Sequence, residues 1–305
     1  MRRLASILGL LLALAPATRA LALDILLTND DGYQAIGIDI MRKALESAGH
    51  RVYVVAPATD QSGKGMSFTT SALLDVIYWG GASRATSVSG TPVDAVRVGL
   101  WLYNDAFKKA PDLVVSGINF GANTGTLANS SGTVGAATWA MMQGIPAIAV
   151  SAANDPSESP PKPPPYPLTA AIMASAAKTT VAVIASLQQT QQGTQLMAPY
   201  TGLNINFPAM VTPNGVVMSQ LGLFNSAALT VRPVPNPALP NGMTFSISLA
   251  ATPQLPFNPR WDTDLLAKGY ATIAPINGDW TATEDQRGSL GRRLGTIAQP
   301  EGSLP

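Results

Sequence analysis

An apolar run that ends in two adjacent aspartates constrains this chain more than any other feature of its sequence. Residues 24–28 read Asp-Ile-Leu-Leu-Thr, and Asn29, Asp30, Asp31 and Gly32 follow at once. A short apolar run bounded by turn residues is typical of a strand buried on both faces of a parallel sheet. The polar residues then fall at the carboxyl end of that strand, where open α/β sheets bind their ligands.

Two neighbouring carboxylates at such an edge repel each other unless a cation or a shared proton compensates their charge. An Asx-type turn exposed to solvent explains the same residues equally well. Composition limits which metal the site could bind, because the chain has no cysteine and a single histidine, His50. A metal would therefore be held mainly by oxygen, which favours Mg²⁺, Mn²⁺ or Ca²⁺ over Zn²⁺. We expect His50 itself, in a tight link between a helix and a strand, to be structural or to face solvent.

The rest of the chain alternates apolar runs with amphipathic segments, which predicts an α/β fold with a mostly parallel sheet covered on both faces. We expect helices at 36–48, 92–103, 134–143 and 168–187, and strands at 51–56, 73–78, 85–88, 112–116, 145–151 and 203–208. The last of these strands is expected to close the main sheet. Shorter β-like segments then alternate with Pro- and Asn-rich loops, which indicates a smaller β-containing extension.

These patterns divide the 305 residues into four parts. Residues 1–22 are predicted to be a signal peptide, and residues 23–210 an α/β domain that carries the chemistry. Residues 211–283 form the C-terminal β-containing extension, and residues 284–305 are expected to be a flexible tail.

The N-terminus has the organisation of a secretory signal. Arg2 and Arg3 precede an apolar core too short to span a bilayer comfortably, and Ala20-Leu21-Ala22 resembles a cleavage site. We expect an exported protein, periplasmic or secreted, that is free of the membrane once cleaved; the alternative is an N-terminal anchor. Cleavage after Ala22 would leave 16 of the 19 basic residues against 18 acidic ones. A slightly acidic body has no general attraction for nucleic acid or anionic membranes, so a small anionic substrate would need local help such as a metal.

Three polar loops are predicted to meet at one edge of the sheet, at 29–32, 60–67 and 116–133. Together they offer two carboxylates, a hydroxyl and carboxamide oxygens, which suit a hard divalent cation with room left for water and phosphate. The third loop ends in Ser131-Gly132-Thr133, directly before a predicted helix. Such a helix N-terminus favours anions, although N-capping by Ser131 or Thr133 explains it as well and can coexist with anion binding. The loop at 60–67 has neither the dinucleotide fingerprint nor the Walker spacing.

Several of these segments together resemble the SurE family of metal-dependent nucleotidases, which are survival-protein, acid-phosphatase-like phosphomonoesterases. The motifs, in chain order, are Leu-Thr-Asn-Asp-Asp-Gly at 27–32, Ala-Pro at 56–57 with Gln-Ser-Gly at 61–63, Gly-Thr-Pro-Val-Asp at 90–94, Pro-Asp-Leu-Val-Val-Ser-Gly-Ile-Asn at 111–119, Ser-Gly-Thr-Val at 131–134, Leu-Asn-Ile-Asn at 203–206 and Asp-Thr-Asp at 262–264. They span most of the chain from Leu23 to about Ala282, and their combination is specific although no single block is.

The resemblance implies a Rossmann-like three-layer α/β/α domain with an oligomerising C-terminal extension, assembled as a homodimer or homotetramer. It implies one divalent cation per subunit, Mg²⁺ or Mn²⁺, held by Asp30, Asp31, Ser62 and Asn119. The implied reaction releases phosphate from nucleoside 5′-monophosphates, with 3′ forms as a further possibility. The residues assigned to phosphate or substrate are Asn29, Gly63, Asn123, Ser131, Gly132 and Thr133.

This chain also departs from the family pattern. Ser130 stands where a tyrosine often precedes the Ser-Gly-Thr turn, and the proline-rich stretch 160–167 resembles an insertion. The expected signal peptide is unusual for the family as well. The resemblance therefore does not extend to base or ribose contacts at Ser130, and export with its consequences for the substrate is specific to this chain.

Asp30 and Asp31 are the catalytic candidates, because either could orient or deprotonate an attacking water. The sequence does not distinguish between them. A nucleophilic Ser62 is disfavoured because no base is evident beside it, and an aspartyl-phosphate route needs Asp-x-Asp where this chain has Asn-Asp-Asp. The rival hypothesis is an exported, non-catalytic protein that binds a nucleotide or phosphate and retains the fold.

Overall fold

The computed structural model describes residues 21–80, 85–158, 165–191, 196–223, 227–235, 238, 243–251, 256–279, 281 and 283–294. The expected signal peptide and most of the proline-rich stretch 160–167 lie outside these residues.

The strands are β1 (Asp24–Thr28), β2 (Arg51–Pro57), β3 (Val76–Tyr78), β4 (Ala85–Val88), β5 (Leu113–Phe120), β6 (Ala147–Ala152), β7 (Thr201–Phe207), β8 (Val216–Met218), β9 (Ala227–Val234), β10 (Thr244–Ala251) and β11 (Ala271–Asn277). The helices are α1 (Ile36–Ser47), α2 (Pro92–Phe107), α3 (Gly132–Met142), α4 (Pro167–Gln189), α5 (Asp262–Ala267) and α6 (Glu284–Leu294), with a 3₁₀ helix, η1, at Gly125–Ser130.

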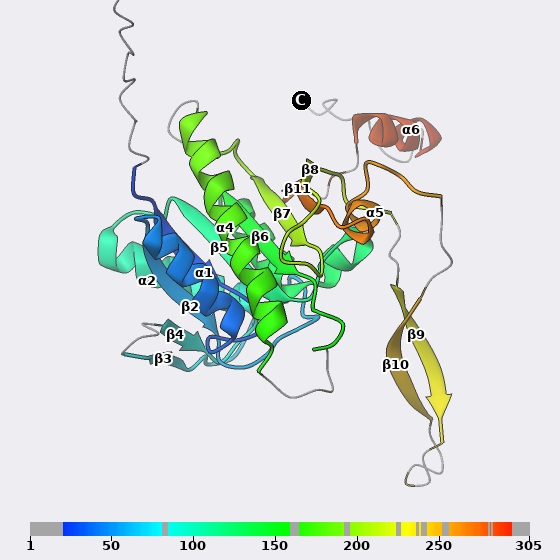
Figure 1. Cartoon of the computed structure of the whole chain (residues 1–305), viewed down its shortest axis with the longest axis horizontal. Coiled ribbons are helices and arrows are strands. Elements are labelled where there is room, and N and C mark those ends of the chain that lie inside the picture. Colours follow the sequence, from blue (N-terminus) through cyan, green and yellow to red (C-terminus); the bar gives the residue numbers. More distant parts are fainter. Residues whose placement is uncertain are drawn as a thin grey trace, which may run out of the picture.

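A nine-stranded sheet in the order β3-β4-β2-β1-β5-β6-β7-β11-β8 forms the body of the protein (Figure 1). The six central strands from β4 to β7 are parallel to one another. The chain moves outward in one direction from β1 to β2 and β4, and in the other direction from β5 to β6 and β7. The switch point of the sheet therefore lies between β1 and β5, which is where ligands bind in such sheets.

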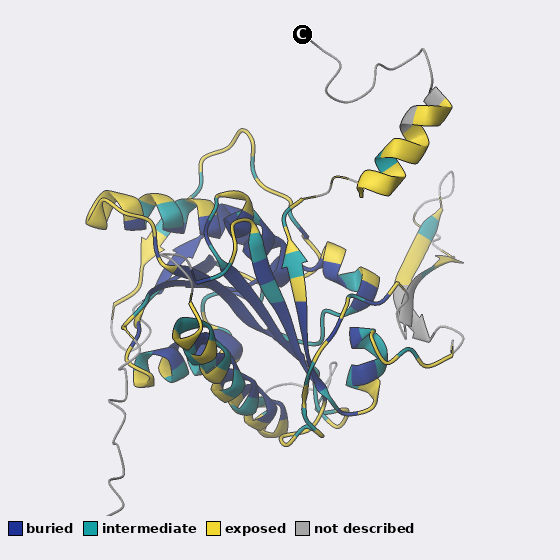
Figure 2. Cartoon of the chain, turned by 90° about the horizontal axis from the view of Figure 1, so that it is seen from above, coloured by how far each residue is buried: buried dark blue, intermediate teal, exposed yellow. Residues whose placement is uncertain are grey.

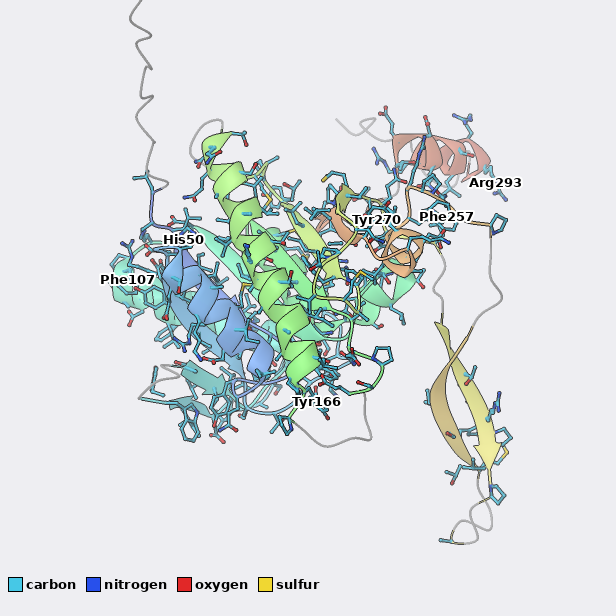
Figure 3. All side chains as sticks on the ribbon, in the orientation of Figure 1. His50, Phe107, Tyr166, Phe257, Tyr270 and Arg293 are labelled. Carbon is cyan, nitrogen blue, oxygen red and sulfur yellow. The ribbon has the colours of Figure 1, made fainter. Side chains whose placement is uncertain are left out.

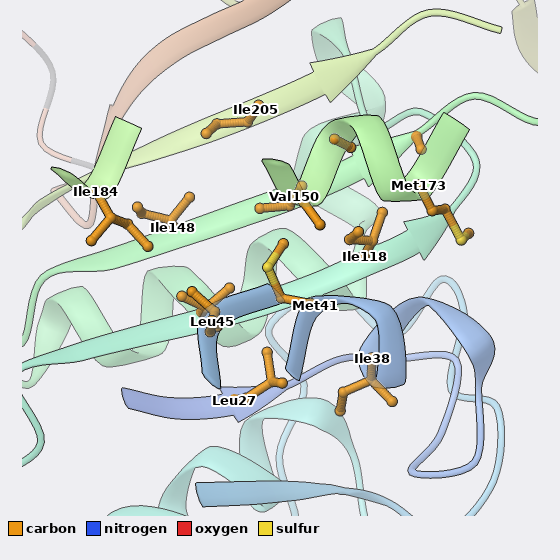
Figure 4. Packing of buried hydrophobic residues seen from close by; sticks show 14 of the residues in the cluster. Leu27, Ile38, Met41, Leu45, Ile118, Ile148, Val150, Met173, Ile184 and Ile205 are labelled. Atoms are coloured by element: carbon orange, nitrogen blue, oxygen red, sulfur yellow. The ribbon is translucent and has the colours of Figure 1, made fainter. Parts of the chain in front are cut away.

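Helices cover both faces of the sheet, so the predicted three-layer α/β/α architecture is confirmed (Figure 2). On one face α1 and α4 pack side by side, and Met41 and Leu45 of α1 meet Ile148 and Ile184 in a continuous apolar layer (Figure 4). On the other face α2 and α3 pack on residues such as Leu26. The three- and four-residue spacing of the apolar positions in α1 explains why one side of that helix is buried.

Helix α4 is long and apolar enough to cross a membrane by length and composition, and it is the one such helix in the described part of the chain. Its residues Ile172, Met173, Ala176 and Ile184 are buried in the layer shared with α1 and the sheet. We therefore interpret it as a core helix.

The prediction that the strand at 203–208 closes the main sheet is wrong. Strand β11 pairs antiparallel with β7, and β8 adds to β11 at the edge. Of the segment 211–283, only β9 and β10 form a separate sheet, an antiparallel hairpin that projects from the body (Figure 1). The division at residue 210 stays a prediction, because the extension contributes strands to both sheets.

The part of the expected flexible tail that the structure describes forms a helix, α6, rather than an irregular segment, and its flexibility stays a prediction. The backbone N–H of Thr283 donates to Oε1 of Gln286 at 3.0 Å, and the backbone N–H of Gln286 donates to Oγ1 of Thr283 at 3.4 Å, in the pattern of a capping box. Acidic residues occupy the first turn of α6 and arginines the last, which favours the helix dipole. Residues 295–305 lie outside the described residues.

His50 has the structural role that the sequence predicts. It is buried, and its Nδ1 accepts a hydrogen bond of 3.2 Å from the backbone N–H of Leu23. Burial also lowers the pKa of His50. Figure 3 shows His50 and Tyr166 at opposite ends of the α1–α4 layer, and Tyr166 packs against Phe120 at the carboxyl edge of the sheet. His50 is therefore remote from the edge where the acidic residues lie.

Candidate active site

The acidic pair lies at the carboxyl end of β1, beside the switch point of the sheet. Asp30 is 2% exposed, and its Oδ1 accepts a hydrogen bond from the hydroxyl of Thr133 in the first turn of α3. Oδ2 of Asp31 accepts a hydrogen bond of 3.1 Å from the backbone N–H of Phe120 in β5. Each carboxylate is thus fixed by a different element of the fold, and the solvated-turn alternative does not describe them.

Among the residues that the structure describes, neither carboxylate of the pair has a positively charged partner. Burial raises the pKa of Asp30, and hydrogen bonds from Thr133 offset part of that effect. Burial and the nearby charge of Asp30 together raise the pKa of Asp31 to about 7. In the part of the chain that the structure describes, no Lys, Arg or His forms an ion pair with either residue. The site therefore concentrates negative charge that a cation would neutralise.

The loop that follows β2 reaches the same place. The backbone N–H of Gln61 donates a hydrogen bond of 2.7 Å to the carbonyl oxygen of Asp30. Oδ1 of Asp60 accepts from the backbone N–H of Ser62 at 2.9 Å and from its hydroxyl at 2.7 Å. Asp60 also raises the pKa values of Asp30 and Asp31 through its charge. Asp60 is not among the site residues predicted from the sequence, although it belongs to the loop at 60–67 that the sequence places at this edge of the sheet.

Asn119 lies next to the acidic pair through its neighbour Phe120. The pairing register of β5 with β6 shifts between Ser116 and Asn119, so the strand continues where a loop was expected. Nδ2 of Asn119 donates a hydrogen bond of 2.7 Å to the carbonyl oxygen of Gly121. Because this bond uses the amide nitrogen, the amide oxygen of Asn119 remains to coordinate a cation.

The donor set fits a hard divalent cation only if neutral oxygens complete it. Among the described residues, no group of three or more His, Cys, Asp or Glu side chains is placed to hold a metal. Asp30 and Asp31 would supply the negative charge, and the Ser62 hydroxyl and the Asn119 amide oxygen would have to supply the rest. Oxygen-only sets of this kind suit Mg²⁺ or Mn²⁺ rather than Zn²⁺.

The first turn of α3 lies directly against Asp30. A Cβ atom on Gly132 would be 2.8 Å from the Cβ of Asp30 and 2.9 Å from its Oδ2, so only glycine allows this approach. The hydroxyl of Ser131 caps the helix by accepting from the backbone N–H of Val134 at 3.1 Å. Both hydroxyls of the predicted anion site, on Ser131 and Thr133, are thus engaged within the protein, and their contact with phosphate stays a prediction.

Asn123 braces the loop between β5 and η1. Its backbone N–H donates to Oδ1 of Asn206 at 2.7 Å, and its Nδ2 donates to the hydroxyl of Ser151 at 2.9 Å. Its carbonyl oxygen accepts from Nδ2 of Asn204 at 2.9 Å. The structure thus gives Asn123 a structural role, and its predicted substrate contact is untested by this geometry.

The two remaining predicted substrate residues differ in their surroundings. Asn29 is fully buried, and its Nδ2 donates a hydrogen bond of 2.9 Å to the carbonyl oxygen of Gly32, which closes the turn at the acidic pair. Gly63 is exposed at the tip of its loop with φ of +75°, a conformation that favours glycine. A cavity of about 980 Å³ on the side of α3 that faces β8 and β11 contains none of the predicted site residues.

A mostly parallel sheet with helices on both faces and an acidic cluster at its switch point defines a Rossmann-like α/β protein with an oxygen-rich ligand site. More specifically, the chain belongs to the SurE family. The family model "Survival protein SurE" matches residues 25–226, which include every predicted site residue.

Relatives and a solved structure agree with this assignment. The chain is 34% identical to the 5′-nucleotidase SurE of Solidesulfovibrio magneticus over 287 residues, covering 89% of this chain and 97% of the relative. It is 35% identical to the 5′-nucleotidase SurE of Nitratidesulfovibrio vulgaris over 259 residues, covering 85% and 88%. The crystal structure of the SurE protein from Aquifex aeolicus superposes with a TM-score of 0.70 at 28% identity, covering 89% of this chain and 99% of that one.

Proposed function

We propose that this chain is a metal-dependent phosphomonoesterase that releases phosphate from nucleoside 5′-monophosphates, with 3′-monophosphates as further candidate substrates. Relatives matched over most of their length carry the name 5′-nucleotidase, and the chain is accordingly a phosphoric monoester hydrolase. The observation that carries the metal dependence is the acidic pair at the switch point, which has no positively charged partner among the described residues.

The proposed cation, Mg²⁺ or Mn²⁺, would be held by Asp30, Asp31, Ser62 and Asn119. When bound, it supplies positive charge for the phosphate oxygens and lowers the pKa of water beside it. The carboxylate of Asp30 or Asp31 would orient the attacking water or accept its proton. Backbone N–H groups in the first turn of α3 favour the phosphate through the dipole of that helix.

Phosphate release from AMP and from p-nitrophenyl phosphate tests the proposal directly. We expect turnover with Mn²⁺ or Mg²⁺, loss of turnover with a chelator, and loss in Asp30→Asn and Asp31→Asn while circular dichroism stays unchanged. Unchanged turnover in either variant would contradict the assignment. Nucleotide binding without any phosphate release would favour the non-catalytic alternative.

We also propose export after cleavage between Ala22 and Leu23. The described fold supports an accessible bond there, because Leu21 is 81% exposed and β1 begins at Asp24. N-terminal sequencing of the protein expressed with its leader should return Leu23 as the first residue, and an intact Met1 would contradict cleavage.

We propose a homodimer or homotetramer that uses the β9–β10 hairpin. The hairpin exposes Val231, Phe245 and Ile247 at 61%, 48% and 67%, and apolar side chains exposed on a two-stranded sheet favour burial against a partner. Light scattering should give two or four subunits, and deletion of the hairpin should lower that number. A monomeric parent protein would contradict the proposal.

A further inference from the structure

The loop at residues 58–70, called the substrate loop here, carries both Ser62 and Gly63. Near the start of the loop, the backbone N–H of Gln61 donates a hydrogen bond to the carbonyl oxygen of Asp30. In its middle, the backbone N–H of Gly65 donates 3.0 Å to the carbonyl oxygen of Ser130. Helix α3 approaches so closely that a Cβ atom on Gly135 would lie 2.2 Å from the carbonyl oxygen of Gly65. The front and the middle of the loop are thus fixed by backbone contacts with the site.

The rear of the substrate loop is attached to one buried carboxylate, that of Asp94. Asp94 is 0% exposed and occupies the third position of α2. Thr69 donates its backbone N–H to Oδ1 of Asp94 at 3.0 Å and its hydroxyl to Oδ2 at 2.7 Å. The same carboxylate accepts the backbone N–H of Thr91 at 3.1 Å and so completes the capping box of α2.

The attachment exceeds what a capping box requires. The reciprocal hydrogen bonds between Thr91 and Asp94 are enough to cap the helix, yet the Asp94 carboxylate also accepts two hydrogen bonds from Thr69. The hydroxyl of Thr91 also donates to the carbonyl oxygen of Ser67 at 2.7 Å. Two residues of the loop are therefore tied to the first turn of α2.

Arg97, one turn further along α2, reinforces this attachment. Its guanidinium donates to the carbonyl oxygen of Thr69 at 3.1 Å and to Oδ1 of Asp94 at 3.2 Å. The guanidinium carbon lies 5.3 Å from the ring centroid of Phe68 and 5.9 Å from that of Trp139 in α3. Burial raises the pKa of Asp94, but hydrogen bonds from Thr69 and Thr91 outweigh that effect and hold its pKa below the ordinary value. The carboxylate is thus ionised at neutral pH and accepts all these bonds.

We propose that Asp94 is a positioning residue for the reaction: it fixes the rear of the substrate loop on α2, so that the loop presents Ser62 and Gly63 to the acidic pair. This inference rests on the function proposed above. It assigns Asp94 no contact with the substrate, because its partners are the loop, the helix cap and Arg97.

Limited proteolysis with trypsin at Lys64 tests loop position without reference to activity. Lys64 is exposed in the substrate loop. We expect Asp94→Asn to raise the rate of cleavage at Lys64 by about tenfold or more, because local opening becomes easier, while cleavage in the helices stays unchanged. The Mn²⁺ dissociation constant, measured by calorimetry, should rise, and KM should rise more than kcat falls.

Asp24→Asn is the matched control. Asp24 is 2% exposed and ion-paired with Arg51 and Lys109, but it lies at the amino end of β1 and contacts no part of the substrate loop. It should lower the melting temperature without exposing Lys64. Should Asp94→Asn fail to fold, Thr69→Val removes one hydrogen bond to Asp94 and should give a smaller change in the same direction. Arg97→Met, which removes the guanidinium contacts with Thr69, Asp94 and the two aromatic rings, should also act in that direction.

Parental rates of Lys64 cleavage and parental Mn²⁺ affinity in these variants would overturn the positioning role. Cleavage that rises equally at Lys64 and in the helices would also overturn it, because Asp94 would then stabilise the fold generally. A parent protein that releases no phosphate would defeat the proposed function, while the proteolysis result would still decide whether Asp94 fixes the loop.

Discussion

The hydroxyl of Thr133 offers the sharpest test of how the fold prepares Asp30. Thr133→Val keeps the size and branching of the side chain, so it removes the hydrogen bond to Asp30 without opening a cavity. A hydrogen bond to a charged group contributes about 1.5–3 kcal/mol. Its loss disfavours the ionised carboxylate by that amount and so raises the pKa of Asp30 further above its ordinary value.

A cation binds the ionised form of Asp30, so protons compete more strongly with it in Thr133→Val. We expect the Mn²⁺ dissociation constant at neutral pH to rise by about ten- to a hundredfold, the factor that corresponds to that energy. Titration calorimetry measures this constant directly, and the loss should shrink as the pH rises. Thr133→Ser keeps the hydroxyl and should bind Mn²⁺ nearly as the parent does. Equal Mn²⁺ affinity in Thr133→Val and the parent would refute the reasoning.

Two further perturbations follow from the same geometry. Gly132→Ala should lower the free energy of unfolding by about 1–3 kcal/mol, because the added methyl group overpacks against Asp30. The same methyl group should displace the Asp30 carboxylate and so lower kcat/KM by about a hundredfold. The matched control is Gly80→Ala, where a Cβ atom meets nothing within 4 Å, and equal behaviour of the two variants in chemical denaturation and turnover would argue against the contact. In the metal-free protein, the raised pKa of Asp31 means that the folded state holds its proton more tightly than the unfolded state, whose value is 3.8. The protonated Asp31 therefore contributes to the stability of the folded state below pH 3.8, and this contribution is lost as the pH rises to about 7. The melting temperature measured in chelator should fall over that interval, and Mn²⁺ should remove the fall. A melting profile that Mn²⁺ leaves unchanged would count against the cation.

Local periodicity was enough to predict the central part of the fold. The buried strands β1, β5 and β6 each contain a short apolar run, and the buried apolar residues of α1 recur at helical spacing. Strands β8 and β11 were assigned to a separate extension because their place in the main sheet depends on pairing with β7, which no local pattern encodes. The helix α6 was missed although Thr283 and Gln286 have the spacing of a capping box.

The site shows the same division between local and distant information. Asp30 and Asp31 were found because they end a buried strand, and Ser62 and Asn119 because of the family motifs that contain them. Asp60 was left out because an exposed aspartate in a polar loop has no local signature of its electrostatic effect on another loop. The brace of Asn123 was not predictable, because its partners Ser151 and Asn206 are 28 and 83 residues away.

The account depends most on a cation held between the acidic pair and two neutral oxygens, those of Ser62 in the loop after β2 and of Asn119 in β5. Anomalous diffraction from crystals grown with Mn²⁺ measures its position directly. We predict one strong peak per subunit within coordination distance of Asp30, Asp31, Ser62 and Asn119. No peak at saturating Mn²⁺, or a peak bounded by other residues, would contradict the account.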